Sequence, residues 1–536
     1  MPRRFLLVFL LLVSVSALFW RLGGRGLNEP DEGRYATIAV QMYDRGDWLV
    51  PRLFERAHVE KPPLTHWLII LAFKAFGVSE FSARLPSALA GLGTVLLTWA
   101  IGRRLLGDRS AVPAALILLT SPFFFIMARL CDPNMVLTFW VTLGFWALIG
   151  WFADGRRWQL HVAYLALALS FMAKGPVGLL LVLLTMIAFR MTRPGPGHWR
   201  VFGSLSGVLL FAVVAFPWFL ILAWRHPELW NFFIRQELFE RYLTKAHARY
   251  EPPWYYLTLL PAFILPWMPA FLLGLIGAFK TWRESPGMRI AVCWIVVPMA
   301  FFSLGGSKLP TYILPILPPV ALVAGYGWML LEERPVWRVT QSTILGLFAV
   351  AVVVGLVGFS RRFQWPVLFS ATGIVFLIAA VALLVVTFFS ARWVRFCAAV
   401  AAMLAVYGFA LDAITRNDCR FAHFSSMRCL AAAIRAEAGP GDTIATYPRT
   451  PPGVGFYLRR PILTTRNEEE LQLKSDQARL VATTYRDEAD LRELINSPSR
   501  VFLIVGERHV DNVMQLGGAR LRDIYRGLYE VVLANF

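Results

Sequence analysis

Apolar segments long enough to cross a bilayer recur along most of this 536-residue chain. Each runs for roughly 18–25 residues, the length that a helix needs to span the hydrocarbon core. The sequence is 57% hydrophobic and only 16% charged, and a single soluble core stops growing beyond roughly 250–300 residues. The segments therefore predict a polytopic α-helical membrane protein and exclude a soluble globular one.

We expect about thirteen transmembrane helices. They lie near residues 5–20, 84–102, 112–130, 134–152, 160–174, 176–191, 202–223, 257–280, 289–304, 309–330, 340–359, 366–389 and 396–414. The first follows Arg3 and Arg4 and resembles a signal peptide without a clear cleavage site, so we expect a retained anchor. Two juxtamembrane helices are expected in the first outer loop, near 32–45 and 63–76, because the second is apolar but too short to span.

The chain carries 53 Lys and Arg against 34 Asp and Glu, a formal charge of +19. The basic residues gather in short loops between apolar segments, which is the positive-inside pattern of a membrane protein in contact with phospholipid. Alternate threading leaves the first loop and the C-terminal region on the outer face. No basic stripe or base-stacking module is present, so nucleic acid is excluded as a partner.

After about residue 417 the composition changes to that of a small α/β domain. Strands are expected in "DTIATYP", "RVFLIVGE" and "YEVVLANF", and helices in "SSMRCLAAAIRAEAG" and "EADLRELI". We therefore divide the chain into a transmembrane domain, 1–416, and a periplasmic α/β domain, 417–536. Cys419 and Cys429 would face an oxidising compartment, where a disulfide is one of two outcomes left open.

The stretch "PDEGRYA" places Asp31, Glu32, Arg34 and Tyr35 directly at a membrane exit. Charges near hydrocarbon are costly, so a dense cluster there indicates a site. The alternative is that a carboxylate merely caps the helix that follows, where unpaired N–H groups favour negative charge.

Further charged residues of the outer face come from distant parts of the chain. Glu60 and Lys61 precede two prolines, and Lys174 closes an apolar run; either lysine could bind a lipid phosphate or simply snorkel to the interface. Asp132 precedes a proline, where aspartate is often only a turn former.

The outer loop 225–256 holds Arg241 and His247 among many aromatic residues, as a lid over a substrate or as an aromatic belt. Lys308 and Tyr312 lie at the mouth of a proline-broken helix, and irregular backbone at membrane depth is tolerated where it lines a cavity.

These motifs, in this order, resemble the C-type membrane glycosyltransferases of the protein O-mannosyltransferase-like group. The likeness is carried by "PDEGRYA", "GDWLVPRL", "EKPPLTHW", "DPN", "AKGPVG", "HARYEPPWYY" and "SKLPTYILP", and its nearest subgroup is the lipid A 4-amino-4-deoxy-L-arabinose transferases. The resemblance implies an undecaprenyl-phosphate-linked sugar as donor, and lipid A or another lipid as acceptor, on the periplasmic face.

The resemblance also implies roles for residues. It makes Asp31 and Asp132 the catalytic carboxylates and Arg34, Lys61 and Lys174 the donor-phosphate ligands. The expected cavity is lined by Glu32, Tyr35, Arg241, Lys308 and Tyr312. Glu60 and His247 resemble a pair that holds a divalent metal ion, although no cofactor is required for the reaction.

The expected chemistry is a direct, inverting displacement, because fixed cations stabilise the charge that develops on the leaving phosphate. Two other functions stay open. One is transfer of another sugar, or transfer to another lipid or a protein hydroxyl. The other is a lipid transporter, which would place charges near the midplane of repeated halves, and the sequence has neither feature.

Overall fold

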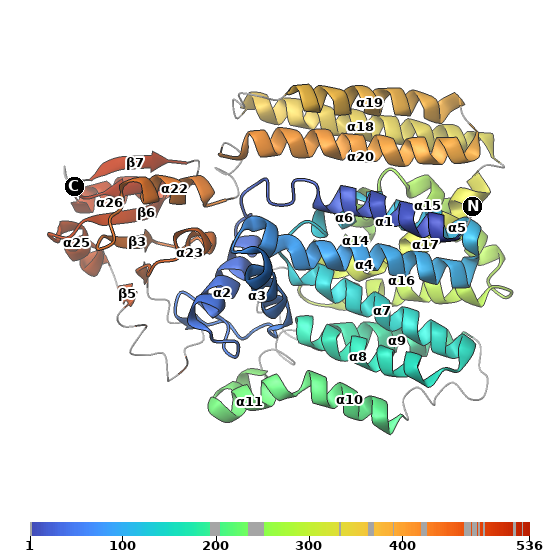
Figure 1. The fold of residues 1–536 in the computed structure, drawn as a ribbon, viewed down its shortest axis with the longest axis horizontal. Coiled ribbons are helices and arrows are strands. Elements are labelled where there is room, and N and C mark those ends of the chain that lie inside the picture. Colours follow the sequence, from blue (N-terminus) through green and yellow to red (C-terminus); the bar gives the residue numbers. More distant parts are fainter. Residues whose placement is uncertain are drawn as a thin grey trace. The chain divides into compact units, whose positions relative to one another are not determined.

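The chain forms two compact units in the computed structural model (Figure 1). The first comprises Met1–Leu22 and Pro86–Ala413, and the second comprises Gly23–Leu85 and Ile414–Phe536. The structure describes residues 3–192, 204–233, 251–331, 334–362, 369–389, 391–419, 426–465, 473, 480, 483–485, 488–517, 521–527 and 529–536.

Helices build the first unit. They are α1 (Arg3–Phe19), α4 (Glu80–Leu106, which begins in the second unit), α5 (Asp108–Thr120), α6 (Pro122–Met127), α7 (Pro133–Asp154), α8 (Arg157–Lys174), α9 (Val177–Met191), α10 (Leu205–Ala215), α11 (Pro217–Arg225), α12 (Leu229–Asn231), α14 (Tyr255–Ile264), α15 (Met268–Lys280), α16 (Pro286–Leu304), the 3₁₀ helix η3 (Pro310–Ile316), α17 (Leu317–Leu331), α18 (Pro335–Arg362), α19 (Ala371–Phe389) and α20 (Arg392–Arg416).

The predicted polytopic helical fold is confirmed, and every predicted span overlaps at least one of these helices. Among the described residues, seven helices are long and apolar enough to cross a membrane, and nine if each of two bent pairs is one span. The prediction of about thirteen spans also counted shorter helices such as α1, α5 and α9.

Proline explains both bent pairs. The α14–α15 pair bends by 117° and the α10–α11 pair by 43°. Pro266 and Pro217 stand at these breaks, and a proline removes a backbone donor and disfavours helical geometry at the preceding residue. Periodicity alone predicted one continuous helix at each place.

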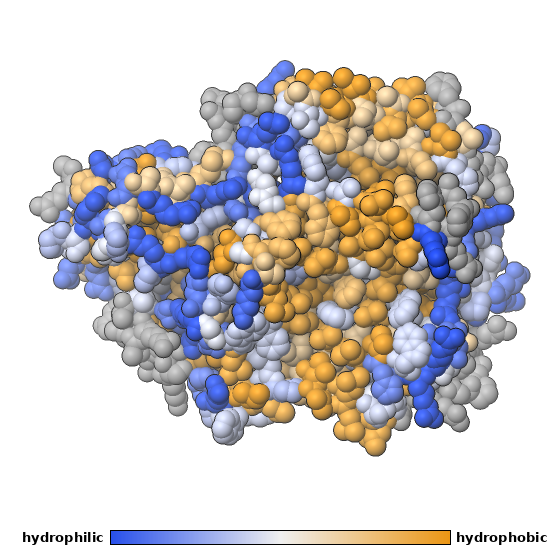
Figure 2. All heavy atoms as spheres, in the orientation of Figure 1, coloured by the Kyte–Doolittle hydropathy of each residue, from blue (hydrophilic) through white to orange (hydrophobic). Residues whose placement is uncertain are grey.

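The helices of the first unit differ in how much of their surface is buried. The apolar window of the segment formed by η3 and α17 is 83% buried, whereas those of α18 and α19 are each 17% buried. Figure 2 shows hydrophobic residues over the helices of this unit. A helix that exposes apolar side chains all along its length is stable in lipid, so α18 and α19 face the bilayer.

The second unit combines short helices and strands from both ends of the chain. They are α2 (Asp31–Arg45), β1 (Arg52–Leu53), β2 (Arg56–Ala57), α3 (Leu64–Phe76), α22 (Arg428–Glu437), β3 (Thr443–Tyr447), α23 (Gly453–Leu458), β4 (Thr464–Thr465), β5 (Thr484–Tyr485), α25 (Glu488–Asn496), β6 (Val501–Gly506), the 3₁₀ helix η5 (Glu507–His509), α26 (Val510–Gly517), β7 (Arg522–Arg526) and β8 (Glu530–Ala534).

A mixed four-stranded sheet in the order β3-β6-β8-β7 is the centre of its C-terminal part. β6 is parallel to β3, with Ile444 opposite Phe502, and antiparallel to β8. All but the last residue of β6 are buried, as expected for a central strand covered on both faces. Helices α25 and α26 contribute Leu491, Ile495 and Val513 to the core cluster on this sheet.

The three predicted strands and two predicted helices of this region are present as β3, β6, β8, α22 and α25, and the two juxtamembrane helices as α2 and α3. Cys419 and Cys429 form a disulfide with an S–S distance of 2.06 Å, which decides the alternative left open by the sequence. The second unit also includes residues 23–85, which the sequence had assigned to the transmembrane domain.

Candidate active site

A polar cluster lies where α7 begins and α8 ends. Asp132 is the N-cap of α7, and its Oδ1 accepts the backbone N–H of Asn134 at 2.6 Å. The amide group of Asn134 donates to Asp132 and accepts from the Lys174 ammonium. Asp132 and Lys174, which are 42 positions apart in sequence, are therefore joined through one intervening asparagine. The sequence analysis named both charged residues but missed Asn134.

The same cluster includes an aromatic ring from η3. The ammonium of Lys174 lies 4.8 Å from the ring centroid of Tyr312, a distance at which a cation is attracted to a ring face. Asp132, Lys174 and Tyr312 are thus brought together within the first unit. A buried carboxylate, a cation and a phenol at the ends of apolar helices are suited to holding a phosphate or a sugar hydroxyl.

Lys308 has a different environment. It is buried, and its ammonium donates to the backbone carbonyls of Glu251 and Gly305 at 2.8 and 2.9 Å. These bonds satisfy the Gly305 carbonyl, directly after α16, and the Glu251 carbonyl, in the segment before α14. Lys308 therefore stabilises the broken segment that precedes Tyr312, and its role as a cavity residue stays a prediction.

In the second unit, α2 begins at Asp31 but Asp31 is not its N-cap. The cap position belongs to Pro30, which offers no side-chain hydrogen bond. The Asp31 side chain is 66% exposed and lies 3.8 Å from the guanidinium of Arg34, one turn along the same helix. An exposed carboxylate that caps nothing leaves the capping explanation without support, and it is available to a substrate.

Glu32 makes a buried, bidentate ion pair with Arg84. Its carboxylate accepts from Arg84 Nε at 2.7 Å and from Arg84 Nη2 at 2.9 Å, and Arg25 lies 3.2 Å away. Burial lowers the pKa of the Arg25 guanidinium to about 10, and Arg84 acts in the same direction. Arg84 also donates to the carbonyls of Arg25 and Gly26. This bidentate geometry fixes Glu32 as an anchor for the first turn of α2.

Three further predicted residues lie in α2 or in the segment before α3. Tyr35 is buried, and its ring centroid is 5.6 Å from that of His66. Glu60 is exposed, and Lys61 donates to the Glu60 carbonyl at 3.3 Å. Pro62 and Pro63 then fix the backbone before α3. The geometry keeps Lys61 near the start of a short apolar helix, as a headgroup ligand requires.

Glu29 was missed by the sequence analysis. Its Oε1 accepts the N–H of Gly453 at 2.7 Å, and its Oε2 is buried with no hydrogen-bond partner among the described residues. Burial raises the pKa of this carboxyl to about 8, although the bond from Gly453 lowers it. A glutamate one position before a proline carries no sequence signal of burial, because its partner comes from the other end of the chain.

The predicted metal ligands are described only in part. Arg241 and His247 lie in 234–250, outside the described residues. Within the described ranges no group of three or more His, Cys, Asp or Glu side chains could hold a metal ion. A metal held by Glu60 and His247 therefore stays a prediction.

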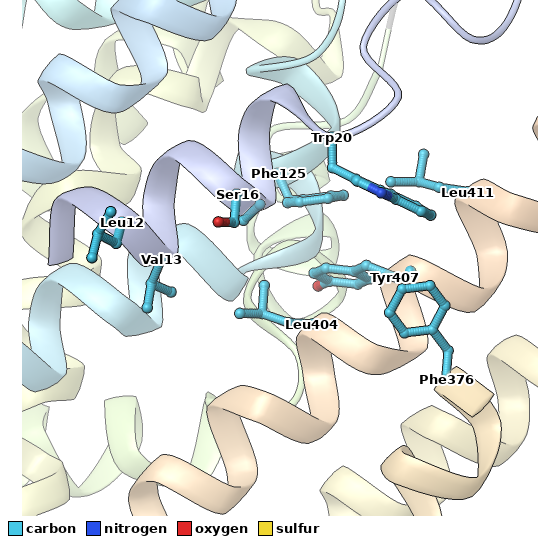
Figure 3. Close-up of a pocket in the computed structure, with 11 residues that line it drawn as sticks. Leu12, Val13, Ser16, Trp20, Phe125, Phe376, Leu404, Tyr407 and Leu411 are labelled. Carbon is cyan, nitrogen blue, oxygen red and sulfur yellow. The ribbon is translucent and has the colours of Figure 1, made fainter. Parts of the chain in front are cut away.

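An apolar cavity of about 390 Å³ lies elsewhere in the first unit (Figure 3). Its walls come from α1, α6, α19 and α20, and they include Trp20, Phe125, Phe376 and Tyr407. None of the predicted site residues lines it. The expected chamber shared by Asp31 and Asp132 concerns residues of both units and stays a prediction.

Comparison with known proteins gives matches across most of the chain. The family model described as Dolichyl-phosphate-mannose-protein mannosyltransferase matches residues 60–224. The undecaprenyl phosphate-alpha-4-amino-4-deoxy-L-arabinose arabinosyl transferase 2 of Pseudomonas fluorescens (strain Pf0-1) is 34% identical over 65% of this chain and 63% of its own length. The corresponding protein of Proteus mirabilis (strain HI4320) is 32% identical over 60% of this chain and 59% of its own. The match thus spans less than two thirds of these relatives.

Solved structures extend the likeness to the full length. The crystal structure of ArnT from Cupriavidus metallidurans bound to undecaprenyl phosphate has a TM-score of 0.83 at 25% identity, covering 100% of this chain and 99% of that one. The apo form has a TM-score of 0.80, with 99% and 98% covered. The chain therefore has the ArnT fold, and it is similar to membrane glycosyltransferases over most of its length.

Proposed function

We propose that this protein transfers 4-amino-4-deoxy-L-arabinose from undecaprenyl phosphate to a phosphate of lipid A, on the periplasmic face of the bacterial inner membrane. The observation that carries the proposal is the full-length match to a structure solved with undecaprenyl phosphate bound. The sequence relatives, whose names give this sugar and this carrier, support the choice of donor.

The residues supply what this reaction requires. When the bond between the sugar and its carrier breaks, negative charge accumulates on the polyprenyl phosphate. Cations held in a water-poor site stabilise that charge, and such stabilisation often contributes more to the rate than any other effect. We assign this role to Lys174 in the first unit and to Arg34 and Lys61 in the second.

The carboxylates have separate tasks. A lipid A phosphate is already ionised and needs no strong base, so Asp31 orients the acceptor or balances positive charge at the anomeric carbon. Asp132 sets the position of Lys174 through Asn134. No step is assigned to a metal ion.

The test uses purified full-length protein, undecaprenyl-phosphate aminoarabinose and lipid A, with the products weighed by mass spectrometry. We expect lipid A to gain the mass of one aminoarabinosyl group. Lys174→Met should abolish the gain, whereas Lys280→Met, another lysine in the last turn of an apolar helix, should leave it unchanged. Sugar found only on another lipid or on protein would reject this donor–acceptor pair.

A further inference from the structure

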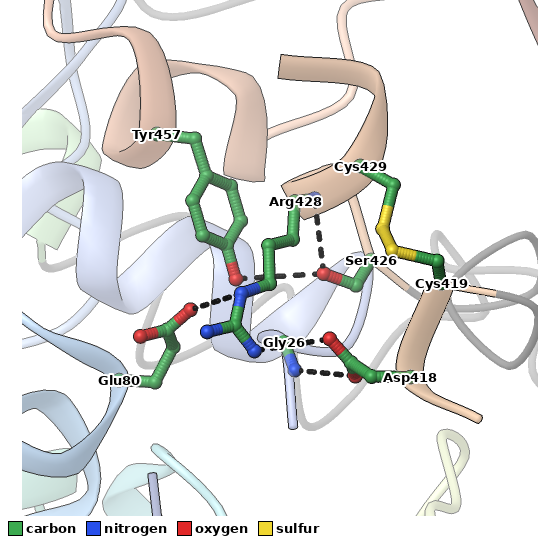
Figure 4. The surroundings of a disulfide bond; sticks show 8 residues. All are labelled: Gly26, Glu80, Asp418, Cys419, Ser426, Arg428, Cys429 and Tyr457. Atoms are coloured by element: carbon green, nitrogen blue, oxygen red, sulfur yellow. Dashed lines mark hydrogen bonds and ion pairs between the residues drawn. A yellow bond between two sulfur atoms is a disulfide. The ribbon is translucent and has the colours of Figure 1, made fainter. Parts of the chain in front are cut away.

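Each cysteine of the disulfide follows a charged residue. Asp418 precedes Cys419 and Arg428 precedes Cys429, and an Arg428 guanidinium nitrogen lies 3.0 Å from the Asp418 carboxylate (Figure 4). Arg428 also pairs with Glu80 at 3.3 Å. The disulfide therefore fixes the distance between the oppositely charged side chains of Asp418 and Arg428, which also holds Arg428 beside Glu80.

These residues bind the backbone that leads into α2. The Gly26 N–H donates to Asp418 Oδ1 at 2.8 Å, and the Leu27 N–H donates to the Tyr457 hydroxyl at 2.8 Å. The Tyr457 hydroxyl lies 3.4 Å from Ser426 Oγ (Figure 4). Two consecutive amides are thus satisfied by side chains from the C-terminal region, although buried amides usually find partners in secondary structure.

Gly26 is required for this close approach. A Cβ added there would lie 2.8 Å from the Cβ of Ser426 and 3.3 Å from that of Arg428. On its other side, the Gly26 carbonyl accepts from Arg84 at 2.7 Å, and Arg84 is the partner of Glu32 in α2. Residues 26–27 are therefore held from both sides, only four positions before Asp31.

We propose that this disulfide cluster, defined as Asp418, Arg428 and Tyr457 with the Cys419–Cys429 bond, positions the start of α2 for sugar transfer. Its members touch the backbone of residues 26–27 and act on the reaction through α2, so they are positioning residues. Misplacing a reacting group by about 1 Å costs up to ~10²-fold in rate, so loss of the cluster lowers turnover. The link to turnover rests on the proposed function.

The first test measures hydrogen exchange of the backbone amides in full-length protein, and it does not depend on activity. Tyr457→Phe removes the acceptor of the Leu27 amide, so exchange over residues 26–35 should rise about tenfold. Tyr447→Phe is the matched control, because the Tyr447 hydroxyl donates to exposed Glu488 in the same unit. The control should leave exchange over 26–35 unchanged.

The second test measures kcat and the donor KM. Asp418→Ala removes the acceptor of the Gly26 amide and should lower kcat about tenfold with KM changed less than about twofold. Asp418→Asn keeps an acceptor oxygen and should restore most of kcat. The double substitution Cys419→Ser with Cys429→Ser should lower kcat in the same way as Asp418→Ala, and reductant should then have no further effect.

The outcomes separate the two proposals. Unchanged exchange in Tyr457→Phe overturns the positioning role. Raised exchange with unchanged kcat also overturns it, because α2 would then not need the cluster for turnover. Raised exchange in a protein that transfers no sugar even as wild type rejects the proposed function and leaves the structural hold on α2 established.

Discussion

Asp132 at the start of α7 and Asp31 at the start of α2 differ in burial and in bonding. Asp132 is buried and is bonded to the backbone of its own helix and, through Asn134, to Lys174. Asp31 is exposed and caps nothing. Its helix is held instead by Glu29, Glu32 and residues more than 390 positions away, since the Gly26 amide binds Asp418 across 392 positions.

The difference shows how a membrane enzyme can supply rigidity in two ways. In the first unit, neighbouring apolar helices already fix the backbone, so the single N-cap at Asp132 is enough to position Asn134 and Lys174. In the second unit α2 also packs through buried apolar residues, and buried ion pairs and side-chain bonds to backbone amides hold the segment that leads into it. Substitutions at the start of α7 and at the start of α2 should therefore differ in their effects on turnover and on stability.

The largest expected effect is on turnover. Asp31→Asn should lower the rate of sugar transfer roughly 10²–10⁴-fold, because it removes the charge to which we assign a role at the anomeric carbon or the acceptor. Thermal unfolding should not change, since the side chain is exposed. Asp44→Asn, which alters an exposed pair with Arg459 at the other end of the same helix, is the control and should retain activity. Full activity in Asp31→Asn would remove Asp31 from the mechanism.

The next effect is on stability. Arg84→Leu removes the bidentate partner of the buried Glu32 carboxylate and leaves Arg25 as its nearest cation, so the free energy of unfolding should fall by roughly 3–5 kcal/mol. Adding Glu32→Leu removes that buried carboxylate and should restore part of the lost stability. Chemical unfolding of both variants measures this. A double variant as unstable as the single one would show that the pair is needed for more than charge balance.

Glu29 should make the second unit sensitive to pH. Burial raises the pKa of its carboxyl from 4.5 to about 8, so the folded state retains a proton that the unfolded chain releases. The resulting stabilisation is complete below pH about 4.5 and is lost as the pH rises through about 8, by roughly 2–4 kcal/mol. The groups facing Glu29 are the Gly453 N–H, Arg34, Glu32 and Glu530.

Glu29→Gln should flatten that pH dependence, because the amide does not ionise. Apparent melting temperatures of wild type and variant, measured from pH 5 to pH 9, should diverge progressively up to about pH 8, with the variant becoming the more stable, and should run parallel above it. Parallel curves over the whole range would show that Glu29 does not titrate in this window.

The smallest effect is expected at the first helix start. Asp132→Ala removes the N-cap of α7 and should cost about 1 kcal/mol, whereas Asp132→Asn keeps a good cap and should cost almost nothing. If Asn also preserves sugar transfer, Asp132 acts only as a cap and as an orienting partner of Asn134. If transfer falls while stability holds, its charge takes part in the reaction.

The sequence predicts the elements well because their signals are local. The ends of α2 and α3 fall within one residue of the predicted 32–45 and 63–76. Apolar length located the spans, and alternation with turn residues located β3, β6 and β8. The bends at Pro217 and Pro266 were missed, because a broken span has the same composition as a straight one.

The site is predicted less completely. Asp132, Lys174 and Tyr312 were named from their motifs, and the first unit does bring them together. Glu29, Arg84 and Tyr457 were missed because their importance comes from partners far along the chain. No local pattern marks Tyr457 as the acceptor of the Leu27 amide, 430 positions earlier.

That separation has a consequence for how the protein is made. The ribosome finishes the N-terminal loop early in synthesis, yet the loop lacks its partners until the C-terminal segment has been made and its disulfide has formed. During most of its synthesis, the N-terminal loop of each nascent chain therefore lacks these contacts. A premature stop after α20 would damage the beginning of the molecule as much as its end.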